Sequence, residues 1–191
     1  MMTNPPALLL IDIQQGLDDP RWGSRNNPMA EMNIALLLRA WRNQRYPVIH
    51  VRHCSTDPDS PLRPGQPGNA LKPCAQPQAG EPEFTKTVNS AFIGTNLETY
   101  LREQSISALV VVGLTTDHCV STSVRMAANL GFEVTVVADA TATFDRRGID
   151  GTHYDADTMH QVNLASLQNE FCRVQSTNHT LADLAGGRNF S

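Results

Sequence analysis

The amino-acid sequence predicts a three-layer α/β/α fold whose central sheet is mainly parallel, doubly wound and Rossmann-like. Two short runs, residues 7–13 and 108–112, are apolar almost throughout, which is typical of strands that are buried on both faces. Such runs alternate along the chain with segments whose apolar residues recur at helical spacing. This alternation implies a parallel sheet with helices on both faces. At 191 residues the chain fits one domain, so we expect residues 1–191 to form a single unit.

In the first half of the chain, the strand at 7–13 is followed by a loop and then by a helix. Pro28 suits a first helical position, and apolar residues at helical spacing continue to about Gln44. Residues 47–51 form the next expected strand. Residues 56–82 are rich in proline, glycine and aspartate, which predicts one long irregular loop. Loops of this length in a compact domain are usually functional or mobile.

In the second half of the chain, strands and helices alternate more regularly. Thr95 and Glu98 have the spacing of a capping box, in which a hydroxyl and a carboxylate each bond a free amide, so a helix should begin there and run to about Gln104. A helix over residues 119–130 should end at Gly131, a favourable C-terminal cap. The other expected elements are strands at 84–86, 108–112, 133–139 and 173–175, and a helix at 157–170.

Composition and charge limit the classes of function. The chain has 15 Lys and Arg residues against 19 Asp and Glu, a net charge of -4. This argues against a nucleic-acid partner, because such proteins carry a strongly basic surface. No run of about 18 apolar residues occurs, so we expect no membrane span and no membrane partner. The first residues lack a basic segment followed by a long apolar core, so we expect a cytoplasmic protein without a secretory signal.

The four cysteines, at positions 54, 74, 119 and 172, lie far apart and include no Cys-x-x-Cys pair. This spacing predicts neither a zinc framework nor a dense disulfide scaffold. In a reducing compartment all four should be free thiols. Only Cys119 has neighbours that suggest chemistry.

Three reactive side chains follow expected strands. Asp12 comes at the end of the first strand, Lys86 near the end of the third, and Cys119 shortly after the fourth. Open α/β sheets bind ligands beyond the carboxyl ends of their strands, so these side chains should meet at one edge of the sheet. Each also has an ordinary explanation on its own, because an aspartate can cap a turn, a lysine can be solvated, and a cysteine can be a small buried apolar residue.

Taken together, the three side chains favour a cysteine hydrolase. A helix N-terminus and a nearby ammonium group both lower the pKa of a thiol, and a carboxylate can accept the proton of the thiol. Backbone amides at the start of the same helix can form an oxyanion hole. Two alternatives are a nucleotide-binding α/β domain and a non-catalytic binding domain. The first lacks both a Gly-x-Gly-x-x-Gly turn and a Walker-type loop, and the complete set of three side chains weighs against the second.

Several segments resemble the isochorismatase-like cysteine hydrolase superfamily, over essentially the chain from residue 7 to about residue 174. The segment around Cys119 is the most specific of them. The matching segments are 12–14 (Asp-Ile-Gln), Lys86 with 90–95 (Ser-Ala-Phe-Ile-Gly-Thr), 113–120 (Gly-Leu-Thr-Thr-Asp-His-Cys-Val), 130–132 (Leu-Gly-Phe) and 139–144 (Asp-Ala-Thr-Ala-Thr-Phe).

The resemblance implies an Asp12, Lys86, Cys119 triad and a homo-oligomer. Cys119 would attack a carbonyl carbon, Asp12 would take and return the thiol proton, and Lys86 would hold Asp12. The resemblance also implies a cis peptide between Leu114 and Thr115, with the backbone amides of Thr115 and Cys119 as the oxyanion donors.

The chain departs from the family's nicotinamidases at the second strand. Those enzymes carry an Asp-x-His metal motif there, whereas this chain has Val-Arg-His-Cys at 51–54. His50 and His53 lie three residues apart and should point to opposite faces of a strand, so we expect no metal site and no cofactor. Isochorismate-cleaving members lack a cysteine nucleophile, so Cys119 favours hydrolysis of a small amide, ureido or imide substrate through a covalent thioester.

Three further residues are candidates for contact with the substrate. Leu17 and Trp22 lie in the loop after Asp12, which can fold over the pocket, although Trp22 can equally pack against its own loop. His118 precedes the nucleophile and can contact the substrate or cap the helix start. The neighbouring Asp117 should favour the helix dipole.

Overall fold

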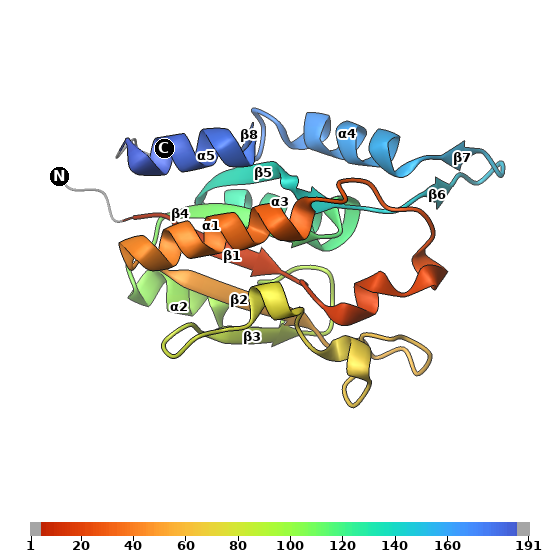
Figure 1. Cartoon of the computed structure of the whole chain (residues 1–191), viewed down its shortest axis with the longest axis horizontal. Coiled ribbons are helices and arrows are strands. Elements are labelled where there is room, and N and C mark those ends of the chain that lie inside the picture. Colours follow the sequence, from red (N-terminus) through yellow and green to blue (C-terminus); the bar gives the residue numbers. More distant parts are fainter. Residues whose placement is uncertain (1–4, 187–191) are drawn as a thin grey trace.

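In the computed structural model, which describes residues 5–186, six strands form one sheet in the order β3-β2-β1-β4-β5-β8 (Figure 1). Every neighbouring pair in this sheet is parallel. The strands are β1 (Ala7–Ile11), β2 (Val48–His53), β3 (Glu83–Lys86), β4 (Ala108–Leu114), β5 (Glu133–Ala142) and β8 (Arg173–Gln175). The order runs outward from β1 in one direction and from β4 in the other, so the sheet is doubly wound, as predicted.

Helices cover both faces of the sheet, and the alternation of side chains along β1 shows which helices lie on which face. Leu8 and Leu10 belong to a core cluster that also contains residues of α1 (Ala30–Gln44) and α5 (Thr177–Ala185). Leu9 and Ile11 belong to a second cluster with residues of α2, α3 and α4. The helices of this second face are α2 (Leu97–Glu103), α3 (Ser121–Asn129) and α4 (Ala156–Leu167). The three-layer prediction is therefore confirmed.

Some element bounds differ from the prediction. The helix expected from residue 28 begins at Ala30, the helix expected over 157–170 covers Ala156–Leu167, and two strands extend further than expected, to Leu114 and Ala142. The sequence analysis also missed α5 and a small antiparallel hairpin of β6 (Arg146–Arg147) and β7 (His153–Tyr154). This hairpin projects from the body of the molecule in Figure 1.

The predicted capping box is wrong in its details. The Thr95 hydroxyl accepts a hydrogen bond from the Leu97 amide at 3.3 Å and donates one to the Ala91 carbonyl at 2.6 Å. The Glu98 carboxylate accepts instead from Arg102, one turn further along α2, at 3.4 Å. The reciprocal bond from Glu98 is therefore missing, and α2 begins at Leu97, two residues after Thr95.

The long loop over residues 56–82 is anchored beside the segment that follows β1. The Lys72 amide donates to the Ile13 carbonyl at 2.8 Å, and the Gln15 amide donates to the Ala70 carbonyl at 2.9 Å. The loop contains two short 3-10 turns, Pro67–Asn69 and Pro73–Ala75. These bonds hold both segments at the carboxyl end of the sheet, at the right of Figure 1.

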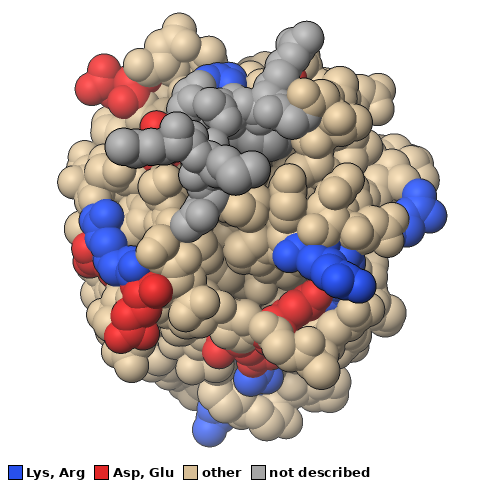
Figure 2. Space-filling view, turned by 90° about the vertical axis from the view of Figure 1, so that its left-hand side faces the viewer, with Lys and Arg blue, Asp and Glu red and all other residues tan. Residues whose placement is uncertain are grey.

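Figure 2 shows the opposite end of the molecule, where the amino ends of the strands lie. Basic and acidic side chains are interspersed there among uncharged ones, and no broad area of one sign stands out among the coloured atoms. Among the described residues, no helix combines the length and the apolar character that crossing a membrane requires. All four cysteines are free thiols.

Candidate active site

The structure brings Asp12, Lys86 and Cys119 together at the switch point of the sheet. Asp12 directly follows β1, Lys86 is the last residue of β3, and Cys119 lies in the turn after β4. The Lys86 ammonium donates to Asp12 Oδ2 at 2.6 Å and to Cys119 Sγ at 3.3 Å. Asp12 and Lys86 are almost wholly buried, at 2% and 1% exposed. The parallel order of β1 and β4 explains this meeting, because both strands end at the same edge.

The end of β4 has an unusual backbone. Gly113 has a φ of 126°, and a Cβ atom there would lie 1.9 Å from the Ile11 carbonyl oxygen, so only glycine fits. The next peptide, Leu114-Thr115, is cis, as the resemblance implied. Thr116–Val120 then form a π-helical turn, and α3 begins only at Ser121. Cys119 therefore lies in the turn that leads into α3, whereas the sequence analysis placed it at the first position of an α-helix.

The environment of Cys119 changes the expected state of its thiol. Burial raises the pKa of Cys119, and the negative charge of Asp12 raises it further, while Lys86 opposes both. From the sequence, the helix start and Lys86 were expected to lower the pKa of Cys119, but burial has the larger effect. Burial also raises the pKa of Asp12, against the opposing charge of Lys86. Burial therefore disfavours a thiolate at Cys119 in the resting site.

The two carboxylate oxygens of Asp12 have different surroundings. Lys86 occupies Oδ2, whereas Oδ1 is buried and has no nitrogen or oxygen donor among the described residues. A buried acceptor without such a donor is uncommon in native proteins and suggests a functional use. The carboxylate is thus held by one oxygen and available through the other.

His53, from the end of β2, completes the cluster. Its Nδ1 lies 3.2 Å from Lys86 Nζ. Atoms of Asp12, His53 and Cys119 that could coordinate a metal ion all lie within 4.8 Å of one another. The Lys86 ammonium, however, is within hydrogen-bond distance of all three side chains. A positive charge already stands among these atoms, which disfavours a metal cation there. His50 points away from the site and meets Glu81 at 2.9 Å, so the two histidines face opposite sides of the strand, as predicted.

A cavity of about 410 Å³ opens above Asp12, His53 and Cys119. The predicted contacts Leu17, Trp22 and His118 all line it. Trp22 also packs against its own loop, since its Nε1 donates to the Gly16 carbonyl at 2.7 Å. The remaining lining residues, which the sequence analysis did not propose as substrate contacts, are His53, Ser55, Asp57, Ser60, Leu62, Asn89, Leu114, Phe144 and Arg146; Thr115 lines the cavity beside Asp12 and Cys119.

Asp117 holds Arg146, one of the residues that line the cavity. Its carboxylate accepts a hydrogen bond from the Thr143 hydroxyl and another from Arg146 Nε at 2.9 Å. Burial alone would raise the pKa of Asp117, but these bonds and the nearby His118 and Arg146 lower it. The carboxylate therefore joins the turn of Cys119 to the segment after β5, a contact beyond the helix-dipole role expected from the sequence.

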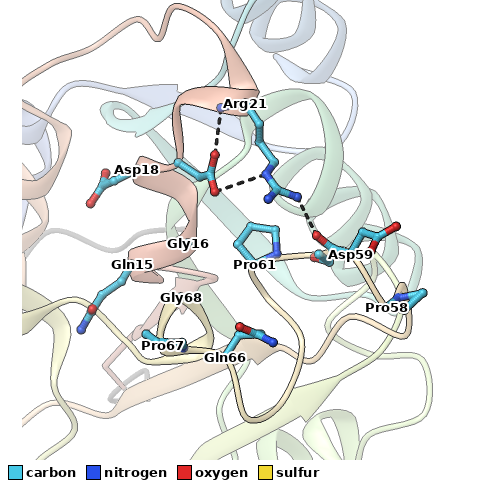
Figure 3. A pocket seen from close by; sticks show the side chains of 12 residues that line it. Gln15, Gly16, Asp18, Arg21, Pro58, Asp59, Pro61, Gln66, Pro67 and Gly68 are labelled. Carbon is cyan, nitrogen blue, oxygen red and sulfur yellow. Dashed lines mark hydrogen bonds and ion pairs between the residues drawn. The ribbon is translucent and has the colours of Figure 1, made fainter.

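A second hollow, of about 490 Å³, lies on the outer side of the same loops (Figure 3). Arg21 bridges it, donating to the Asp59 carbonyl at 2.6 Å while its Nε lies 3.2 Å from Asp19 Oδ2. Ser60 lines both this hollow and the active-site cavity. The two loops therefore form a shared wall, and on its outer side the hydrogen bond from Arg21 to the Asp59 carbonyl joins one loop to the other.

Comparison with known proteins places the chain in a family. The family model described as isochorismatase domain matches residues 6–179. The chain belongs to the isochorismatase family. This family member is 44% identical over 182 residues to the uncharacterized isochorismatase family protein YrdC of Bacillus subtilis, covering 95% of this chain and 97% of the relative.

Two further relatives support hydrolase chemistry. A crystal structure of a hydrolase assigned to the isochorismatase family, from Chromobacterium violaceum, superposes with a TM-score of 0.93 at 48% identity, over 97% of this chain and 96% of the other. Maleamate amidohydrolase of Pseudomonas putida is 29% identical over 202 residues, covering 95% of this chain and 89% of the relative. The chain is therefore an isochorismatase-family hydrolase.

Proposed function

We propose that this isochorismatase-family hydrolase cleaves a C–N bond of a small amide, ureido or imide substrate through a covalent thioester on Cys119. The arrangement of Asp12 carries the proposal. One oxygen is held by Lys86 at 2.6 Å, and the other is buried without a nitrogen or oxygen donor among the described residues. This combination suits a general base that must accept a proton from a neighbouring thiol.

In the first half of the reaction, Cys119 Sγ attacks the substrate carbonyl carbon as its proton passes to Asp12. The carbonyl oxygen becomes an oxyanion, which the backbone N–H groups of Thr115 and Cys119 stabilise. When the oxyanion collapses, the C–N bond breaks. Asp12 gives the proton to the leaving nitrogen, and the acyl group remains on sulfur as a thioester.

In the second half, water attacks the thioester carbon and Asp12 takes a proton from that water. The C–S bond then breaks, the acid leaves, and the proton returns to sulfur. Lys86 keeps Asp12 ionised and in place between the two proton transfers. A reducing compartment such as the cytoplasm would keep the Cys119 thiol available.

The cavity supports a small substrate. Its volume of about 410 Å³ suits a small molecule. The Trp22 and Phe144 rings, with centroids 6.2 Å apart, form an apolar wall together with Leu17. Arg146 and His118 also line the cavity and offer it polar nitrogen atoms. The similarity to maleamate amidohydrolase supports C–N hydrolysis as the reaction class.

A mass spectrum of the intact protein after incubation with a pool of small amides tests the proposal. We expect an added acyl mass on Cys119 together with turnover. Cys119→Ala should lose both, and Cys119→Ser should be almost inactive because a hydroxyl is much harder to deprotonate. Asp12→Asn should lose about 10²–10⁴-fold in turnover. Cys54→Ala is the matched control and should keep most of the activity.

Two outcomes would count against the proposal. Near-normal turnover in Cys119→Ala would remove the nucleophile from the mechanism. No turnover of any amide, combined with a nucleotide that raises the melting temperature, would favour the alternative of a nucleotide-binding or non-catalytic domain.

A further inference from the structure

His53 stands next to Lys86 because of the register of two strands. In the pairing of β2 with β3, His53 and Lys86 are direct Cα partners at the last position of each strand. Both side chains point to the cluster at the sheet edge, where His53 Nδ1 lies 3.2 Å from Lys86 Nζ. The contact therefore joins two side chains already fixed by their backbones.

The contact between His53 and Lys86 indicates which nitrogen of the imidazole carries the proton. An ammonium group has three N–H donors and no acceptor. The three donors of Lys86 meet three partners, namely Asp12 Oδ2 at 2.6 Å, Cys119 Sγ at 3.3 Å and His53 Nδ1 at 3.2 Å. His53 must therefore accept through an unprotonated Nδ1, so its ring is neutral and carries its proton on Nε2.

The buried side-chain amide of Gln14 holds the backbone of His53 by hydrogen bonds. The side chain of Gln14 accepts from the His53 amide at 2.9 Å and donates to the His53 carbonyl at 2.9 Å. Asn69 donates to the same carbonyl at 3.0 Å. Gln14 is completely buried and stands two residues after Asp12. In the Asp-x-Gln motif, Asp12 is thus the proposed base, and Gln14 bonds the backbone of His53.

We propose that His53 is a positioning residue that fixes the Lys86 ammonium between Asp12 and Cys119, and that protonation of His53 at acidic pH abolishes this hold. The proposal rests on the proposed function for its kinetic consequences. A protonated ring has no acceptor at Nδ1 and puts a second positive charge beside Lys86. The ammonium would then turn away from its position, and Asp12 would lose its alignment with the thiol.

The surroundings define the direction of this pH effect. The titratable groups that face His53 are Lys86 from β3, Asp12 from the end of β1 and Cys119 from the turn after β4; Asp57, His118 and Arg146 line the same cavity. Burial lowers the pKa of His53 and the charge of Lys86 lowers it further, against the charge of Asp12. The neutral, accepting ring is therefore the form present near neutral pH, and it is lost as the pH falls below the ordinary histidine range.

Three variants test whether His53 positions the Lys86 ammonium or only stabilises the fold. His53→Asn keeps an acceptor oxygen near the place of Nδ1 but cannot titrate, so kcat should stay within a few-fold of wild type and fall only at lower pH, where Asp12 alone titrates. His53→Ala lacks the acceptor and should lose on the order of 10²-fold in kcat with little change in KM. His50→Asn, the matched control, removes a buried imidazole of the same strand outside the site and should keep the wild-type pH profile.

A nitrogen-15 NMR spectrum of the imidazoles supplies a readout that needs no substrate. We expect the Nε2–H form of His53 at pH 7, and we expect its pKa to rise toward the ordinary value in Lys86→Met. An Nδ1–H form, or a His53→Asn pH profile that overlays the wild type, would overturn the inference. If no amide is turned over, the proposed function fails, whereas the NMR result and the pH dependence of Cys119 alkylation by iodoacetamide still decide the role of His53.

Discussion

Replacing Lys86 by methionine removes a buried charge and keeps most of the side-chain volume. Lys86 and Asp12 are buried and in contact at 2.6 Å, where opposite unit charges attract by about 6 kcal/mol at an effective dielectric constant of 20. The variant need not lose this full amount, because Asp12 can take up a proton. From its ordinary pKa of 3.8, protonation at pH 7 costs about 4 kcal/mol, since each pH unit is worth about 1.4 kcal/mol.

Urea unfolding of Lys86→Met should therefore show a loss of about 4 kcal/mol at pH 7, within the range of about 3–5 kcal/mol typical of a broken buried pair. Without Lys86, the pKa of Asp12 in the folded state is raised further above its unfolded value. Such a group stabilises the fold at low pH and loses that contribution as the pH rises. The deficit relative to wild type should accordingly shrink to about 2 kcal/mol at pH 5.

Two controls make the measurement specific. The double variant Lys86→Met with Asp12→Asn removes both charges and should recover most of the loss. Lys72→Met removes another lysine with a buried side chain, but its partner Glu31 keeps a second cation, Arg25, at 2.6 Å. Its deficit should depend far less on pH. Wild-type stability of Lys86→Met at pH 7, or a deficit that grows toward pH 5, would refute the reasoning.

Three further outcomes are expected. Gly113→Ala should lose about 3 kcal/mol or more in unfolding free energy, because its Cβ would lie 1.9 Å from a carbonyl oxygen, whereas Gly131→Ala, with a similarly positive φ and open space, should lose about 1–2 kcal/mol; equal losses in urea unfolding would contradict this. Activity should survive exhaustive chelation because Lys86 occupies the centre of the donor cluster, and loss with recovery on zinc, manganese or iron would reverse the prediction. Sedimentation at micromolar protein should give a dimer or larger species, and a mass near the 20.9 kDa of one chain would exclude it.

The strands of the sheet could be predicted because each has a recognisable local pattern of apolar residues. Runs buried on both faces are apolar at nearly every position, as in β1 and β4. The ends of β4 and β5 were harder to predict from the sequence. β4 continues through Gly113, and β5 continues through residues that are typical of a loop. The hairpin of β6 and β7 has two residues in each strand, most of them charged or polar, so no period exists to detect.

The candidate site was predictable to the extent that it follows from topology. The carboxyl ends of β1, β3 and β4 collect Asp12, Lys86 and Cys119 whatever the details of the loops. His53 was missed as part of this group because it was considered only as a metal ligand. Its position as the last residue of β2 is the signal that could have found it, but the partner of that position depends on the register with β3, which residue spacing does not determine.

The state of the Cys119 thiol shows where reasoning from single neighbours fails. A helix start and a lysine would both lower the pKa of a thiol, and from the sequence they are the visible influences. The folded chain puts Cys119 in a π-helical turn, where it is partly buried beside the Asp12 carboxylate. Its partial burial and the charge of Asp12 raise the pKa of the thiol instead. A resting thiolate is therefore disfavoured, and the proposed attack by Cys119 needs a base that removes the thiol proton as the new bond forms. We propose Asp12 as this base, because Lys86 holds its Oδ2 while its Oδ1 has no nitrogen or oxygen donor among the described residues.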